Sequence, residues 1–168
     1  QQRYKLLPNA VAHATGLHTG EVDIVGEGAH ALWASNALGG KLAQERCKSS
    51  GFLRYVKTTL NDPKIKQKDP HSKYRRKIVG MLLSLANDNK TMQKFLVDEG
   101  YRAIIHKTLT ENPTLSFAGE FSSLKGWIKE EYDSPSFATD DAEPRARTPT
   151  RRNDSDDKQS KKPKDDRE

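Results

Sequence analysis

One stretch of sequence occurs twice in this chain, and the repetition strongly limits what the chain can fold into. Residues 31–63 align without a gap on residues 80–112, at an offset of 49 residues, when Gly51 is placed on Gly100. Such periods are typical of repeat architectures, in which each unit buries its apolar face against the next unit. A duplicated structural unit explains the pattern. The matched pairs are Ser35 with Ser84, Ala37 with Ala86, Lys41 with Lys90, Gln44 with Gln93, Phe52 with Tyr101 and Leu60 with Leu109.

Apolar residues recur at three- and four-residue spacing up to about residue 132, and no stretch alternates for long with a period of two. This spacing predicts α-helices and argues against strands. Glycines and Asp62-Pro63 mark the expected ends of helices and units. The expected helices are 21–38, 41–50 and 52–60 in the first copy, 71–86, 91–99 and 101–109 in the second, 6–17 before them and 115–132 after them.

Composition divides the chain near residue 132. Residues 133–168 contain four prolines, dense charge of both signs and one large apolar residue, Phe137. We expect this segment to be a disordered tail, because it cannot bury enough apolar surface to offset its ordering entropy. The chain begins at Gln1 without an initiator methionine, and we expect it to begin within a longer protein. The expected divisions of residues 1–132 are a partial repeat at 1–20, repeats at about 21–63 and 64–112, and a capping helix at about 113–132.

Two stretches carry a family resemblance. Residues 29–37 (Ala-His-Ala-Leu-Trp-Ala-Ser-Asn-Ala) and 78–87 (Ile-Val-Gly-Met-Leu-Leu-Ser-Leu-Ala-Asn) are each followed by a short helix that ends in glycine. This order of features resembles the armadillo (ARM) repeat family, whose units of roughly 40 to 47 residues consist of helices. The resemblance implies an all-α, armadillo-like right-handed α-solenoid of two to three repeats; the alternative fold is a non-repetitive helical bundle. It also implies a non-catalytic protein–protein interaction scaffold or adaptor that binds its partner in a concave groove.

In armadillo proteins the longest helix of each unit lines the groove, and peptide-binding members place a ladder of Trp and Asn residues there. This sequence departs from that ladder. Trp33 falls beside the ladder positions, and we interpret it as a core aromatic residue. A groove floor of small residues lets a whole helix approach closely, which favours helix-in-groove docking. The Trp positions are taken by Ala31, Gly80 and Ser122, and the Asn positions by Ser35, Ser84 and Gly126.

Positive charge is concentrated in residues 61–77. This segment has seven Lys and Arg residues against Asp62 and Asp69, a net charge of +5, which is most of the +7 carried by residues 1–132. We expect the surplus to attract an acidic helix or peptide of a protein partner. The predicted partner-binding residues of the groove and the basic patch are Lys73, Arg76, Lys77, Ala31, Ser35, Gly80, Ser84 and Ser122.

A nucleic-acid-binding helical-repeat protein is the alternative function, although the patch offers only Tyr74 and His71 for base stacking. No histidine spacing matches a metal site and no glycine-rich motif matches a phosphate loop, so we expect no metal, no cofactor, no small-molecule substrate and no enzymatic activity. Cys47 aligns with Leu96, which predicts a core position. No apolar window is long enough to span a membrane, and one cysteine gives no internal disulfide. We therefore expect an intracellular protein, in the cytoplasm, at the cytoskeleton or in the nucleus.

Overall fold

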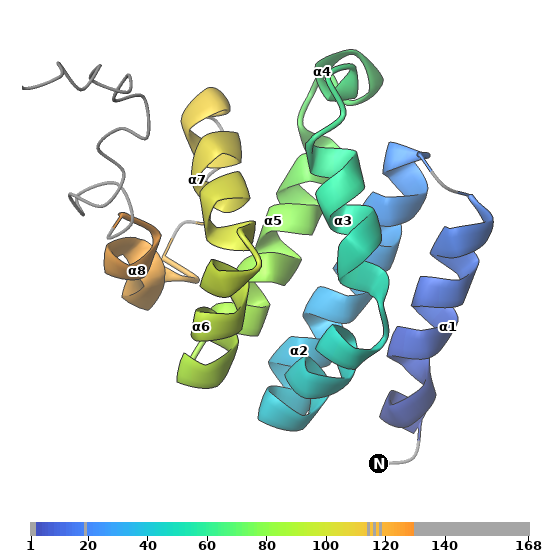
Figure 1. The fold of residues 1–168 in the computed structure, drawn as a ribbon, viewed down its shortest axis with the longest axis vertical. Coiled ribbons are helices and arrows are strands. Elements are labelled where there is room, and N and C mark those ends of the chain that lie inside the picture. The colour runs from blue at the N-terminus through green and yellow to red at the C-terminus, as the bar shows by residue number, and fades with distance from the viewer. Residues whose placement is uncertain (1–2, 19, 114, 116, 118, 130–168) are drawn as a thin grey trace, which may run out of the picture. The chain divides into compact units, whose positions relative to one another are not determined.

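The part of the chain that the structure describes is helical. The structure is a computed structural model that describes residues 3–18, 20–113, 115, 117 and 119–129. These residues form helices and turns and no β-strand, so the expected all-α class is confirmed, while the predicted tail at 133–168 lies outside the described residues. In chain order the helices are α1 (Arg3–Leu17), α2 (Val22–Ser49), α3 (Phe52–Leu60), α4 (Ile65–Lys68), α5 (Lys73–Ala86), α6 (Lys90–Asp98), α7 (Tyr101–Glu111), the 3₁₀ turn η1 (Ser122–Leu124) and α8 (Lys125–Lys129) (Figure 1).

Glycines stand at three of the expected helix breaks. α2 kinks at Gly40, whose φ of 55° and ψ of −147° lie in a region that is essentially restricted to glycine. Gly51 (φ 79°) and Gly100 (φ 76°) are both left-handed and immediately precede α3 and α7. These two helices begin at Phe52 and Tyr101, which are separated by the same 49 residues as the repeated sequences.

The helices pack in an order that follows the repeated sequence. α1 packs against α2 and α3, α3 also contacts α7, and α2 packs most extensively against α5. α6 contacts both α5 and α7, and α8 contacts α7. Among the described helices, α1 therefore lies at one edge and α8 at the other (Figure 1).

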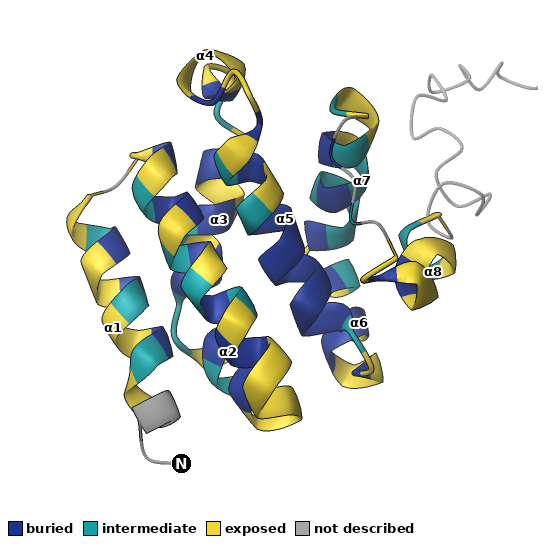
Figure 2. Cartoon of the chain, turned by 180° about the vertical axis from the view of Figure 1, so that it is seen from behind, coloured by how far each residue is buried: buried dark blue, intermediate teal, exposed yellow. Residues whose placement is uncertain are grey.

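The core is centred on α5. Residues 78–86 are all buried, so this part of the helix is covered on every side and is dark blue throughout in Figure 2. α2 and α3 are buried mainly on the faces that they turn toward the core, whereas α1 is exposed on its outer side. The largest fully buried side chains include Leu32, Phe52, Ile78, Met81, Leu82, Leu83, Leu85, Met92, Leu96 and Ile105. No helix among the described residues is long and apolar enough to cross a membrane.

The segment after α7 differs from the single helix expected at about 113–132. Its described residues become helical only at Ser122, in η1 and α8. Gly119 has a φ of 92°, which a continuing α-helix does not allow, and Leu115 and Phe121 before the turn are buried. The apolar spacing that resembled a long helix instead includes Leu115 and Phe121, which are buried although neither lies in a helix.

Candidate partner-binding face

Two glycines allow α2 and α5 to approach each other closely. A Cβ atom at Gly26 of α2 would lie 2.7 Å from two atoms of the Tyr74 side chain on α5, and a Cβ atom at Gly80 of α5 would overlap the indole ring of Trp33 on α2. Real Cβ atoms do not approach other atoms this closely, so any larger residue would push the helices or the rings apart. The two contacts are reciprocal: each helix places one aromatic ring over a glycine of the other.

Trp33 is the centre of an aromatic cluster. Its ring centroid lies 6.0 Å from that of Phe117 and 6.0 Å from that of Phe121, and the two phenylalanine rings lie 5.7 Å apart. His30, one turn earlier on α2, meets Trp33 edge-on at 6.4 Å. Trp33 and Phe117 are half-buried, so part of the cluster reaches solvent. The guanidinium carbon of Arg76 lies 5.4 Å from the centroid of Phe117, a cation–π distance.

The first turn of α5 adds positive charge beside this cluster. The amino groups of Lys73 and Lys77 lie 5.0 Å and 5.8 Å from the centroid of Tyr74. Lys77 is also paired with Glu27 of α2 at 2.5 Å, and the hydrogen bond from Lys77 holds the pKa of Glu27 below its ordinary value. Among the described residues no carboxylate pairs with Lys73, which is exposed.

Much of the remaining charge of residues 61–77 is neutralised by pairing. Lys66 forms an ion pair with Glu111 at 3.3 Å, and Lys68 forms one with Asp62 at 2.8 Å. The hydrogen bond between Lys68 and Asp62 lowers the pKa of Asp62 and raises that of Lys68. These pairs lie at α4 and at the end of α7. The predicted patch is therefore divided between the insertion, which is residues 61–72 between α3 and α5, and the start of α5.

Arg75 is buried and holds the insertion in place. Its Nε donates to Asp69 Oδ2 at 3.3 Å, its Nη2 donates to the Asp69 carbonyl at 2.6 Å, and its Nη1 donates to Asn112 Oδ1 at 2.7 Å. Asn112 in turn donates to the Thr108 carbonyl, and the Ser72 hydroxyl contributes a further bond to Asn112 Oδ1. Arg75 therefore joins the segment before α5 to the end of α7.

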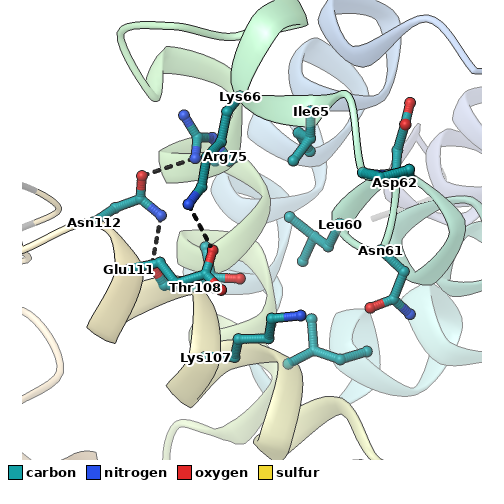
Figure 3. Close-up of a pocket in the computed structure, with 12 residues that line it drawn as sticks. Leu60, Asn61, Asp62, Ile65, Lys66, Arg75, Lys107, Thr108, Glu111 and Asn112 are labelled. Atoms are coloured by element: carbon teal, nitrogen blue, oxygen red, sulfur yellow. Dashed lines mark hydrogen bonds and ion pairs between the residues drawn. The ribbon is translucent and has the colours of Figure 1, made fainter.

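A pocket of about 250 Å³ lies beside this network, between α3, α4, α5 and α7. Figure 3 shows the bond from Arg75 to Asn112 and the ion pair from Lys66 to Glu111 on one side of the pocket, with Asn61 on the opposite side. Arg75 and Lys66 already have carboxylate or amide partners within the chain. The pocket therefore offers Lys107 as its one lining cation without a carboxylate partner among the described residues.

Small and polar side chains lie buried in the contact between α2 and α5. The Asn36 side-chain amide donates to Ser84 Oγ at 3.0 Å, and Ser84 Oγ donates to the Met81 carbonyl. The Gln44 amide donates to the carbonyls of Ser84 and Asn87. Both Asn36 Oδ1 and the hydroxyl of the neighbouring Ser35 are buried without a hydrogen-bond partner in the described part of the chain.

The predicted partner-binding residues are thus only partly brought together. Arg76 and Gly80 lie at the aromatic cluster, but the ring of Trp33 covers Gly80. Phe117 and Phe121 were missed by the sequence reasoning, although their four-residue spacing in an otherwise weakly apolar segment is a usable signal. Lys73, Arg76 and Ser122 are exposed, Ala31 and Lys77 are half-buried, and Ser35, Gly80 and Ser84 are buried.

Cys47 lies in the core, as predicted. It is fully buried, its Sγ is 3.9 Å from Met81 Sδ, and burial raises the pKa of its thiol to about 12. The described residues contain no group of three or more His, Cys, Asp or Glu side chains that could hold a metal ion.

Comparison with known proteins finds no family model, no curated protein and no solved structure that matches this chain. The resemblance to armadillo repeats therefore remains a prediction from the residues quoted above.

Proposed function

We propose that the chain is a non-catalytic scaffold or adaptor built as an armadillo-like right-handed solenoid, and that it binds a protein partner on the face formed by α2 and α5. The solenoid proposal is supported by the packing order, in which α3 contacts α7 and α2 contacts α5, the helices that the 49-residue offset relates. It is also supported by the two left-handed glycines that precede α3 and α7. Stacked helical units present extended surfaces that suit binding.

The observation that carries the binding proposal is the half-buried aromatic cluster beside exposed cations. Trp33 and Phe117 remain partly accessible, and Arg76 and Lys73 lie exposed at the same face. Trp and Arg are enriched among the residues that dominate binding energies at protein interfaces, because they combine a large apolar area with a directed polar group.

The proposed partner is an acidic helix or peptide. Its carboxylates would pair with Lys73 and Arg76, and an apolar side chain would pack on the exposed parts of Trp33 and Phe117. Since Gly80 and Ser84 are covered, we place the partner on the accessible edges of the cluster rather than on a floor of small residues. Lys77 would contribute less, because it already pairs with Glu27.

The test is a quantitative pull-down with mass spectrometry that compares the wild-type chain with a Lys73→Glu/Arg76→Glu variant. The matched control is Lys64→Glu/Lys107→Glu, which changes the charge equally at exposed positions near α4 and α7. The proposal predicts proteins whose capture falls more than about tenfold with the first variant, the equivalent of about 1.4 kcal/mol, and is unchanged with the control. If both variants recover the same proteins in the same amounts as the wild type, the face binds no acidic partner.

Titration of the wild type and the two double variants with a mixed-sequence single-stranded oligonucleotide distinguishes nucleic acid binding from binding of an acidic protein partner. Binding that is tight and weakens steeply between about 50 and about 200 mM salt would favour the alternative over the scaffold. The scaffold proposal predicts weak binding that Lys73→Glu/Arg76→Glu and Lys64→Glu/Lys107→Glu reduce equally, because such binding responds to total charge.

A further inference from the structure

Another pocket, with a volume of about 360 Å³, lies between α5, α7, α8 and the segment that joins α7 to α8. This volume falls within the range of about 300–1,000 Å³ that is typical of binding pockets. Among the described residues that line it, Ser122 and Lys125 are the ones with polar side chains. The large apolar side chains in its wall are Leu83, Leu109, Leu115, Phe117, Phe121 and Ile128.

The burial of these side chains shows how the pocket is oriented. Leu83 of α5 is 1% exposed, Phe117 and Ile128 are half-buried, and Ser122 and Lys125 are exposed. The pocket therefore has an apolar floor on α5 and opens to solvent beside Ser122 and Lys125. An apolar group that enters it is removed from water on several sides, which is the main source of binding energy in such pockets.

The pocket is continuous with the proposed binding face. Phe117 and Phe121 belong to its wall and also pack against Trp33 in the aromatic cluster. Arg76 lies over the ring of Phe117, with its guanidinium carbon 5.4 Å from the ring centroid. A partner that covers Trp33 and Phe117 therefore reaches the pocket without crossing another part of the surface.

The charge beside the pocket indicates what its occupant carries. Lys125 is exposed, and among the described residues no carboxylate pairs with it. The cations of the neighbouring face, Lys73 and Arg76, have the same sign and are also exposed. An apolar group attached to an acidic chain complements both the wall of the pocket and these charges, whereas an apolar group attached to a basic chain would be repelled.

We propose that this pocket holds a leucine or aromatic side chain of the acidic partner, and that a carboxylate of the same partner pairs with Lys125. The inference rests on the proposed function and adds the residue types that select the partner. In a helical partner, the carboxylate would stand three or four residues from the apolar side chain, because that spacing places both on one face of a helix. A bulky side chain in a pocket, surrounded by charges, is a common centre of binding energy at interfaces.

The pocket itself is tested with 3-phenylpropionate, a small probe that joins an aromatic ring to a carboxylate. In the full chain, the amide NMR signals of Gly119 and Ile128 should shift on titration to about 20 mM, because a probe of this size binds in the millimolar range. The uncharged 3-phenylpropionamide should bind about threefold more weakly, since it cannot pair with Lys125.

Two pairs of variants locate the probe. Ser122→Trp places a large side chain at the opening and should abolish the shifts, whereas Ser123→Trp, exposed in the same turn but outside the pocket wall, should leave them unchanged. Lys125→Glu should weaken binding about threefold, and Lys129→Glu, exposed on the same helix, should have less effect. The absence of shifts in the wild type overturns the proposal, as does equal loss of binding in Ser122→Trp and Ser123→Trp.

A pull-down separates this inference from the proposed function. Proteins whose capture requires Lys73 and Arg76 should fall about tenfold with Ser122→Trp and be retained with Ser123→Trp, as expected for loss of an anchoring side chain. If these proteins are retained in full with Ser122→Trp, the face binds its partner without the pocket, and this inference alone is wrong. If no captured protein depends on Lys73 and Arg76, the proposed function fails, and the occupant assigned to the pocket fails with it.

Discussion

Gly26 and Gly80 determine how closely α2 and α5 can pack. Each glycine lies under an aromatic ring from the other helix, Tyr74 and Trp33 respectively. Sequence reasoning predicted Gly80 in the groove floor and Trp33 in the core, but it could not pair them, because the two residues are 47 positions apart and fall at different positions in the repeat alignment. The contact depends on the offset between neighbouring helices, which the repeat pattern alone does not specify.

We expect Gly80→Ala to destabilise the chain by about 1–3 kcal/mol, since the added methyl group would meet the rigid indole ring of Trp33. Gly126→Ala on α8 is the matched control, because a Cβ there meets nothing within 4 Å. Alanine in a helix is otherwise more favourable than glycine, so the control should be neutral or slightly stabilising. Urea unfolding measures the stability of both variants. Equal unfolding midpoints for Gly80→Ala and Gly126→Ala would refute the close contact.

The thiol of Cys47 should be unreactive in the folded chain. Its pKa of about 12 keeps it protonated at pH 8, and burial excludes reagents, so Ellman's reagent should react only after unfolding. The unfolded thiol loses its proton at lower pH than the folded one. Stability should therefore fall between about pH 9 and about pH 12 relative to a Cys47→Ala variant. Rapid reaction of the folded chain at pH 8 would show that Cys47 is accessible.

At the scale of helices, the boundaries set by left-handed glycines were predicted best. α3 and α7 follow Gly51 and Gly100 as expected, because local backbone conformation determines where these helices begin. The break expected at residues 39–40 is confirmed as well, because Gly40 is non-helical and separates two helical parts of α2. In the segment expected as a helix at about 113–132, the described residues become helical only at Ser122. Side chains of that segment contact Trp33 on α2, which is far away in the sequence, and these contacts outweigh local helix propensity. A single sequence does not reveal such contacts.

Residues 61–77 were predicted as basic surface, but Arg75 within this segment is buried. Arg75 and Asp69 are 3% and 2% exposed, and they join the insertion to Asn112 at the end of α7. A sequence window shows the number of charges but not which of them find partners from other helices. Glu27 and Glu111, which neutralise two lysines of the segment, lie outside it.

Removal of the Arg75 charge should therefore be much more harmful than removal of a surface charge. We expect Arg75→Met to cost about 3–5 kcal/mol, because Asp69 would remain buried without its ion-pair partner. Lys94→Met is the matched control: Lys94 forms an exposed ion pair with Asp98, and its loss should cost less than about 1 kcal/mol. Thermal unfolding followed by circular dichroism would show the difference. A similar melting temperature for the two variants would mean that the Arg75 network contributes little.

At the scale of the whole helical unit, α2 and α5 connect the two copies of the repeated sequence. Their contact combines the two aromatic–glycine pairs with the buried hydrogen bonds from Asn36 and Gln44. The same contact positions Trp33 beside Phe117 and Arg76, so the packing of the copies and the proposed binding face depend on one helix–helix offset.

Nuclear Overhauser effects in the purified chain measure this offset most directly. The packing of α2 against α5 predicts effects from the Trp33 indole protons to the α protons of Gly80 and to the ring of Phe117. It also predicts effects from the Tyr74 ring to the α protons of Gly26. If Trp33 and Tyr74 show effects only to residues of their own helices, α2 and α5 do not pack in this way, and the proposed binding face is not formed.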